Sequence, residues 1–298
     1  MVFLNCYMLG KGHCVTINWY PGHMAKARRQ LTEQLRLADV VVEVCDARIP
    51  LSSRNPDLDQ MTAHKQRILL MNKADLANKA ATDRWLSYLQ GRGISAYALN
   101  ANRSARTVLP LIEKAAAQTV ARAMQRGIRK TVRAMVVGVP NVGKSTIING
   151  MKGRATLLVA DRPGVTRSTQ WFKVGPYLEL MDSPGLLWPK LEDRTAARRL
   201  AYIGSIRDEV LDAEKLAVQL LDELMIRHSD LILARYKLSD GSLRGEALLH
   251  AICRARGFLI KGGELDIERG VTMVLDEFRG GVIGKITLEM PPNEAENV

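Results

Sequence analysis

The chain has 298 residues, of which 47% are hydrophobic and 25% charged, a composition typical of a globular protein with a buried core and room for two domains. No apolar run approaches the ~20 residues of a membrane-spanning helix, and the first residues show no secretory signal, so we expect a cytoplasmic protein without a membrane anchor. The four cysteines lack C-x-x-C spacing, which argues against a zinc site and against a disulfide-linked partner.

The net charge of +12 is unevenly distributed along the chain. Residues 1–189 carry 27 Lys and Arg against 12 Asp and Glu, a net charge of +15, whereas residues 190–298 carry 16 against 19, a net charge of −3. Because Lys and Arg displace the counterions condensed on phosphate, the basic part favours contact with a nucleic acid. The alternative is that this charge only keeps the protein soluble.

The first part of the chain alternates between strand-like and helix-like patterns. A helix is predicted over 24–38, with Met24, Ala27, Leu31, Leu35 and Ala38 on one face. Strands are predicted over 38–48, 66–75, 94–101, 132–140, 167–175 and 177–185, and helices over 81–93, 104–125 and from residue 145 onward. This alternation indicates an α/β fold with a mostly parallel sheet flanked by helices.

After residue 191 the patterns become helical. Helices are predicted over 213–225, 242–257 and 266–281, and the last places Ile267, Val271, Val274, Leu275 and Phe278 on one face. We therefore expect a disordered extension over 1–16, an α/β domain over 17–190, a small all-α domain over 195–285 and a loose tail over 286–298.

The segment GVPNVGKS at 138–145 has the form G-x-x-x-x-G-K-[ST] and lies between a predicted strand and a predicted helix. Gly138 and Gly143 would let backbone N–H groups cradle phosphates, Lys144 would reach the β- and γ-phosphates, and Ser145 would bind Mg²⁺. The residues expected to bind the nucleotide here are Gly138, Asn141, Val142, Gly143, Lys144, Ser145 and Thr146. The segment predicts a phosphate-binding loop.

Two later segments complete the phosphate and metal chemistry. Asp182 begins DSPG after the strand over 177–185 and would hold the water shell of Mg²⁺, while the N–H group of Gly185 would reach the γ-phosphate. D-x-x-G alone is a common turn, but about forty residues after a phosphate loop it indicates a nucleotide switch. Thr166, between the two, is placed to offer its hydroxyl to Mg²⁺ and its N–H to the γ-phosphate.

The segment NKAD at 72–75 ends a predicted strand and has the form that reads guanine in GTPases. Asp75 could accept hydrogen bonds from guanine N1–H and N2–H₂, Asn72 could bond the base edge and brace the phosphate loop, and the stem of Lys73 could cover the ring. Asn100 and Ala101, which end the next strand, are candidates for the loop behind the base. The motifs therefore follow the order base (G4), base (G5), phosphate (G1), Mg²⁺ (G2) and γ-phosphate (G3), so those for the base precede those for the phosphates. Since chain termini often lie close together, the order G4–G5–G1–G2–G3 is that of a circularly permuted GTPase domain.

With this order, the segments WYPGHMAKA (19–27), DARIPLSSRNP (46–56), NKAD, GVPNVGKST and MDSPGLLWP resemble the YlqF/RbgA family of circularly permuted ribosome biogenesis GTPases. The similarity runs from about residue 17 to residue 285. It implies a P-loop GTP hydrolase that acts in late assembly of the large (50S) ribosomal subunit and binds the ribosome and its rRNA in a GTP-dependent manner. We expect a monomer that uses Mg²⁺.

The resemblance also bears on catalysis. Leu186 stands where many GTPases have a Gln that orients water, and the family pattern points instead to His23, whose imidazole could align or deprotonate the water. The alternative is that His23 contacts RNA or only packs. Asn141 occupies a place where potassium-activated GTPases have an Asn that helps to hold K⁺, a positive charge that would replace an arginine finger.

The candidate RNA contacts are the basic residues Lys26, Arg28, Arg29, Arg122, Arg126, Arg129, Lys130 and Arg133. Each run could instead be a solvated helix face. Two other functions remain open from the sequence: a partner in RNA modification, and a GTP-dependent RNA-binding switch with little intrinsic hydrolysis.

Overall fold

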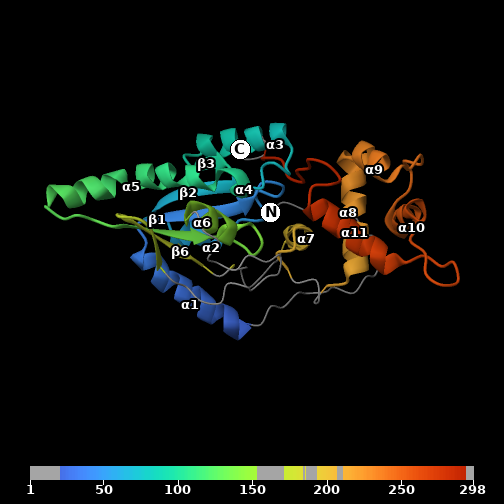
Figure 1. Ribbon diagram of the computed structural model, residues 1–298, viewed down its shortest axis with the longest axis horizontal. Helices are drawn as coiled ribbons and strands as arrows, with labels where there is room; N and C mark the ends of the chain where they lie inside the picture. The colour runs from blue at the N-terminus through green and yellow to red at the C-terminus, as the bar shows by residue number, and fades with distance from the viewer. Residues whose placement is uncertain (1–20, 153–170, 184, 186–192, 207–210, 293–298) are drawn as a thin grey trace, which may run out of the picture.

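The computed structural model describes residues 21–152, 171–183, 185, 193–206 and 211–292, and side chains from residue 29 onward. His23, Lys26 and Arg28 lie in a described helix whose first side chains fall outside this part, and Thr166 and Leu186 lie wholly outside it. Figure 1 shows a sheet with helices on both sides and helices α8, α9, α10 and α11 gathered beyond one of its ends.

A six-stranded sheet forms the centre of the first part, in the order β3-β2-β1-β4-β6-β5. The strands are β1 (Val40–Asp46), β2 (Gln66–Asn72), β3 (Ser95–Ala98), β4 (Val132–Val137), β5 (Trp171–Gly175) and β6 (Leu178–Asp182). All pairs are parallel except β5 with β6. The prediction of a mostly parallel sheet is confirmed.

The strands form where the sequence is apolar in continuous runs, because helices cover both faces. Every residue of β1 is buried. One face packs against α5 (Val108–Gln125) and α6 (Lys144–Lys152). The other packs against α1 (Pro21–Leu37), α2 (Asp57–Met61) and α3 (Lys79–Gly91), and on α1 the predicted core residues Leu31 and Leu35 are buried.

Strand β1 joins the two parts of the sheet. Its residues Val40–Asp46 pair with Gln66–Asn72 of β2 on one side, and Val40–Glu43 pair with Ala134–Val137 of β4 on the other. The strands before residue 99 therefore form one half of the sheet and those after residue 131 the other half. A single sheet thus contains both sets of motifs.

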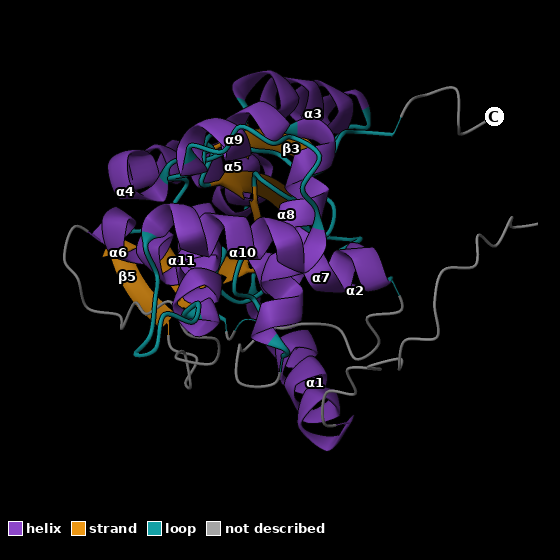
Figure 2. Ribbon diagram, turned by 90° about the vertical axis from the view of Figure 1, so that its right-hand side faces the viewer, coloured by secondary structure: helices purple, strands orange, loops and turns teal. Residues whose placement is uncertain are grey.

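The second part is helical. Its helices are α7 (Arg194–Tyr202), α8 (Ala213–Arg227), α9 (Ser229–Tyr236), α10 (Gly245–Arg256) and α11 (Ile267–Arg279). In Figure 2, which is turned by 90° from Figure 1, this helical part faces the viewer. Val271, Val274, Leu275 and Phe278 of α11 are buried as predicted, and Ile267 is half-buried. The sequence pattern missed α7 and α9, and also the short α2 and α4 (Ala101–Ser104), whereas the 3-10 turn Ala105–Thr107 lies within the helix predicted over 104–125.

The prediction of a loose tail from residue 286 is wrong for residues 286–289. Ile286, Thr287, Leu288 and Glu289 are all buried, with exposed fractions of 5% or less. The N–H of Ile286 donates to the carbonyl of Leu76, and the indole Nε1 of Trp85 donates to the carbonyl of Glu289. This segment crosses back from α11 onto the first part of the molecule.

Candidate functional site

The predicted motifs come together at one edge of the sheet. Strands β1, β2, β3, β4 and β6 run parallel, so their carboxyl ends share an edge. NKAD begins with the last residue of β2, residues 99–101 follow β3, the glycine loop follows β4 and Asp182 ends β6. In an open α/β sheet this edge is where ligands bind.

The two glycines of the loop are required by what surrounds them. Gly138 has a φ of 154°, and a Cβ there would overlap the carbonyl oxygen of Val44 in β1. Gly143 has a φ of 94°, and a Cβ there would overlap the side-chain nitrogen of Asn72. The loop therefore lies directly against β1 and against the first residue of NKAD, where only glycine fits.

Asn72 ties three segments together. Its Nδ2 donates to the carbonyl of Val142 in the glycine loop at 2.7 Å, and its Oδ1 accepts from the N–H of Ala101 at 3.0 Å. Asn72 is 2% exposed, so both bonds lie away from water. The predicted bracing of the phosphate loop by Asn72 is present in the structure, together with a link to the loop after β3.

Lys73 also reaches the glycine loop. Its backbone has a φ of 58°, and its Nζ donates to the carbonyl of Asn141 at 2.7 Å. Asn141, with a φ of 60°, donates its side-chain Nδ2 to the carbonyl of Gly204 at 2.6 Å. Non-glycine residues rarely adopt such positive φ angles. Two of them joined by one hydrogen bond indicate that the surrounding contacts fix the backbone at both positions.

Asp75 and Asn100 lie at the same edge. Asp75 is exposed in the turn after β2, which leaves its carboxylate accessible to a base. Asn100 caps α4, because its Oδ1 accepts from the N–H of Asn102 at 3.1 Å. The contact of either residue with guanine stays a prediction.

Lys144 begins α6 and is buried, with an exposed fraction of 6%. Its Nζ donates to the carbonyl of Val139 at 2.9 Å, within the loop that it is predicted to serve. Burial lowers the pKa of Lys144 from 10.5 to about 8, and the nearby carboxylate of Asp182 offsets only part of this effect. A phosphate group would therefore find a cation whose burial is poorly compensated, which favours binding.

Ser145 and Asp182 form a hydroxyl–carboxylate pair beside Lys144. The Oγ of Ser145 donates to Oδ2 of Asp182 at 2.7 Å. Hydroxyl and carboxylate oxygens with room for water are the ligands that Mg²⁺ prefers, so this donor set fits the predicted ion. The partly buried Gly185 lies against the loop, because a Cβ there would come within 2.7 Å of the backbone nitrogen of Pro140.

The candidate RNA-binding residues divide into two groups. Arg29, Arg122, Arg126 and Arg129 are exposed. Lys130 instead pairs with Asp39 at 2.9 Å, and Arg133 pairs with Glu179 at 3.1 Å and lies over the ring of Trp171. The exposed arginines are therefore the better candidates for a nucleic-acid contact.

Two groups of residues at this site were not assigned a role from the sequence. Asp46 and Arg48, within the DAR segment, form a buried ion pair next to Lys73. Gly204 and Ser205, after α7, hold the glycine loop from its other side, with Ser205 Oγ donating to the carbonyl of Pro140 at 2.6 Å. The charged residues Asp46 and Arg48 at the end of an apolar strand were a signal in the sequence for the first group. The position of Gly204 and Ser205 depends on tertiary packing and has no such signal.

Comparisons with known proteins agree with this geometry. The family described as "50S ribosome-binding GTPase" matches residues 133–242, so NKAD precedes the matched span. The chain is 42% identical to Ribosome biogenesis GTPase A of Bacillus cereus over 95% of this chain and 97% of that protein. It is 31% identical to the protein of the same name from Thermotoga maritima, over 92% and 95%.

Solved structures give the same result. The GDP-bound structure of TM YlqF is similar with a TM-score of 0.64 and 27% identity, over 89% of this chain and 100% of that one. The GNP-bound YlqF from T. maritima is similar with a TM-score of 0.62 and 28% identity, over 90% and 99%. This chain is therefore a GTP hydrolase that belongs to the ribosome biogenesis GTPase A (YlqF/RbgA) family.

Proposed function

We propose that this GTPase is a cytoplasmic, monomeric assembly factor that binds the large ribosomal subunit and its rRNA late in maturation, in a GTP-dependent manner. The observation that carries the proposal is the meeting of the base-reading and phosphate-binding motifs at one sheet edge, in a family whose curated members are named for ribosome biogenesis. Among the residues that the structure describes, no helix is long and apolar enough to cross a membrane.

The residues at the edge divide the work of binding GTP. Asp75 reads the guanine, and Asn72 holds the glycine loop in place beside it. The N–H groups of that loop and Lys144 bind the phosphates. Ser145 and Asp182, with Thr166, would hold Mg²⁺, which would supply positive charge to the phosphates.

Hydrolysis needs a positioned water, and we assign this task to His23. Asn141 would hold K⁺, which would supply additional positive charge. A partner that places His23 beside the γ-phosphate would raise the hydrolysis rate, so activity should be low in the isolated protein. The exposed Arg122, Arg126 and Arg129 would contact rRNA, since their charges have no carboxylate partner in the contacts described above.

GTP hydrolysis measured with and without 50S subunits, in K⁺ and in Na⁺, tests this proposal. We expect strong stimulation by the subunit in K⁺, lost in His23→Ala while GTP binding stays intact. His64→Ala is the matched control, because His64 is exposed at the amino end of β2, on the opposite edge of the sheet. Absence of stimulation would overturn the ribosomal role, and stimulation that survives His23→Ala would move the catalytic group elsewhere.

The GTP dependence has its own test. We expect the affinity for 50S subunits to be higher with a non-hydrolysable GTP analogue than with GDP, so that hydrolysis releases the protein. Equal affinities would contradict this arrangement and would favour a binding module whose hydrolysis has another purpose.

A further inference from the structure

The DAR segment (46–48), which begins with the last residue of β1, contains a buried ion pair with no role in the chemistry above. Asp46 is 0% exposed and Arg48 is 1% exposed. Arg48 Nε donates to Asp46 Oδ1 at 2.9 Å, Nη2 donates to Oδ2 at 2.8 Å, and the backbone N–H of Arg48 adds a bond at 3.0 Å. A buried ion pair is weak evidence for stability, because desolvation offsets most of its attraction. The role of this pair therefore lies in the groups that it holds in position.

On one side the pair holds the guanine-reading motif. Asp46 Oδ2 lies 3.3 Å from Nζ of Lys73, the same ammonium group that donates to the carbonyl of Asn141. Burial would raise the pKa of Asp46, but the charges of Arg48 and Lys73 outweigh it and hold that pKa well below its usual range. Asp46 thus remains a carboxylate and fixes Lys73 against the glycine loop.

On the other side the pair holds the end of α11. Nη1 of Arg48 donates to the carbonyls of Phe278 at 3.0 Å and of Arg279 at 3.1 Å, and the guanidinium lies over the ring of Phe278. The last carbonyls of a helix lack partners within the helix and carry its partial negative charge. Arg48 therefore caps α11 from the first part of the molecule.

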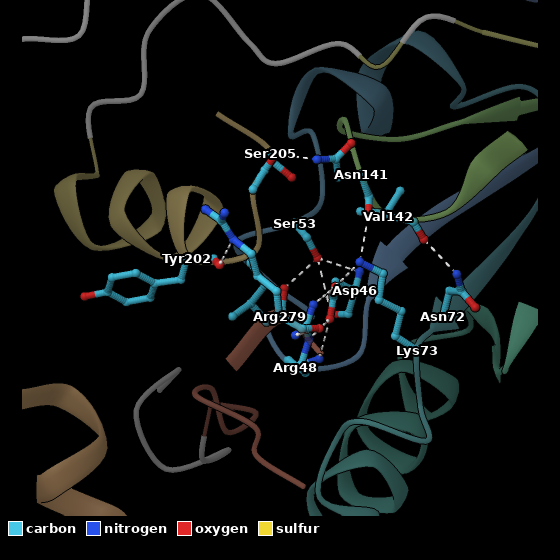
Figure 3. Close-up of polar contacts among 12 residues, drawn as sticks. Asp46, Arg48, Ser53, Asn72, Lys73, Asn141, Val142, Tyr202, Ser205 and Arg279 are labelled. Carbon is cyan, nitrogen blue, oxygen red and sulfur yellow. Dashed lines mark hydrogen bonds and ion pairs between the residues drawn. The ribbon is translucent and has the colours of Figure 1, made fainter. Parts of the chain in front are cut away.

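A second path returns from α11 to the glycine loop. Nε and Nη2 of Arg279 donate to the carbonyls of Tyr202 and Ala201 at the end of α7, both at 3.1 Å. Directly after α7, the carbonyl of Gly204 accepts from Asn141. Figure 3 shows Asp46, Arg48, Lys73, Asn141, Tyr202 and Arg279 gathered in one place. The contacts thus form a closed ring that includes both nucleotide motifs and both ends of the helical part.

We propose that Asp46 and Arg48 are positioning residues that couple GTP binding to the docking of the C-terminal helices, by fixing Lys73 and the end of α11 through one shared carboxylate–guanidinium pair. The inference rests on the proposed nucleotide site. Coupling between two sites is reciprocal, so the nucleotide must tighten the end of α11 as much as that end tightens the nucleotide.

Arg48→Lys is the variant that tests this coupling. It keeps a positive charge beside Asp46, but one ammonium cannot hold both carboxylate oxygens and also reach two carbonyls of α11. We expect GDP to bind about tenfold more weakly by calorimetry, which corresponds to about 1.4 kcal/mol. In hydrogen exchange, GDP should slow the amides of residues 280–282 in the wild type and leave them unchanged in Arg48→Lys.

Arg54→Lys is the matched control. Arg54 follows the same strand and holds Glu43, also buried, by two parallel bonds of 2.9 and 3.2 Å, and none of its contacts described by the structure reaches Lys73 or α11. We expect it to keep wild-type GDP affinity and GDP-dependent protection of residues 280–282. Should Arg48→Lys fail to fold, Arg279→Lys, at a half-buried position, interrupts the ring at α7 and should lower affinity in the same direction.

The outcomes separate this inference from the proposed function. Equal effects of Arg48→Lys and Arg54→Lys on GDP affinity, or protection of residues 280–282 that persists in Arg48→Lys, would overturn the coupling while leaving the GTPase intact. A wild-type protein that binds no GDP would overturn both. Loss of affinity and of protection in Arg48→Lys alone would establish the coupling.

Discussion

Replacing Asn72 by Ala should disrupt the nucleotide site through its framework. The variant removes the donor to the carbonyl of Val142 and the acceptor from the N–H of Ala101. Both partner residues are buried, and a buried polar group left without a partner costs about 1 to 3 kcal/mol. We therefore expect the free energy of unfolding to fall by about 2 to 6 kcal/mol, and GDP binding to weaken at least about tenfold because the loop is no longer held in its bound form.

Urea unfolding and calorimetric titration with GDP measure the two quantities. Asn102→Ala is the control, since Asn102 is exposed in α4, directly after Ala101, and should change neither. A double-mutant cycle with Gly143→Ala sharpens the test, because the added methyl group would meet the side chain of Asn72 itself. Gly143→Ala should cost less in the Asn72→Ala background than in the wild type. Equal costs in both backgrounds, or wild-type GDP affinity in Asn72→Ala, would refute this account.

Three further predictions concern other parts of the molecule. The pKa of Lys144 is about 8 in the folded, nucleotide-free protein against 10.5 ordinarily. Between these two pH values the unfolded state binds more protons, so the free energy of unfolding should rise with pH, by up to about 3 kcal/mol. Urea titrations should show this rise in the wild type and not in Lys144→Met. Deleting residues 286–298 should lower the unfolding free energy by at least about 3 kcal/mol, because two buried aliphatic side chains are lost, and calorimetric melting temperatures will show it. Ser145→Ala should lower GTP hydrolysis on the order of 10²-fold, as removal of Mg²⁺ by a chelator should, whereas a variant that keeps full activity without the ion would contradict the assignment.

Most of the sheet could be predicted from the sequence, because strands buried on both faces are continuous apolar runs. Strand β1 is such a run apart from Glu43, strand β2 is one from Ile68 to Met71, and each ends where polar motif residues begin. The helices α7 and α9 could not be predicted in the same way. The buried face of α7 consists mainly of alanines (Ala196, Ala197 and Ala201, with Leu200), and α9 spans only eight residues, so neither helix shows a long stripe of large apolar side chains.

The local part of the site was also predictable, since each motif is a short consecutive segment with its own chemistry. The bracing role of Asn72 was expected from NKAD at the end of a strand together with the phosphate motifs of the same chain. The burial of Glu289 was not predictable, because a carboxylate two residues before a pair of prolines is typical of a tail. Its oxygens accept from the backbone N–H groups of Leu51 and Ser52, and it also contacts Arg199, so its burial depends on partners that are distant in sequence. Burial raises the pKa of Glu289 despite those bonds.

The pairing of β1 with β4, which joins the two halves of the sheet, has a consequence for synthesis of the chain. The half of the sheet that contains NKAD is translated first, and one side of β1, from Val40 to Glu43, has no neighbour until Ala134–Val137 emerges. During that interval an apolar strand edge is open to pairing with other chains, the state in which nascent proteins aggregate most readily. In the re-ordered domain the base-reading half therefore stays incomplete for part of translation, and the GTP site finishes folding only after the phosphate loop has been synthesised.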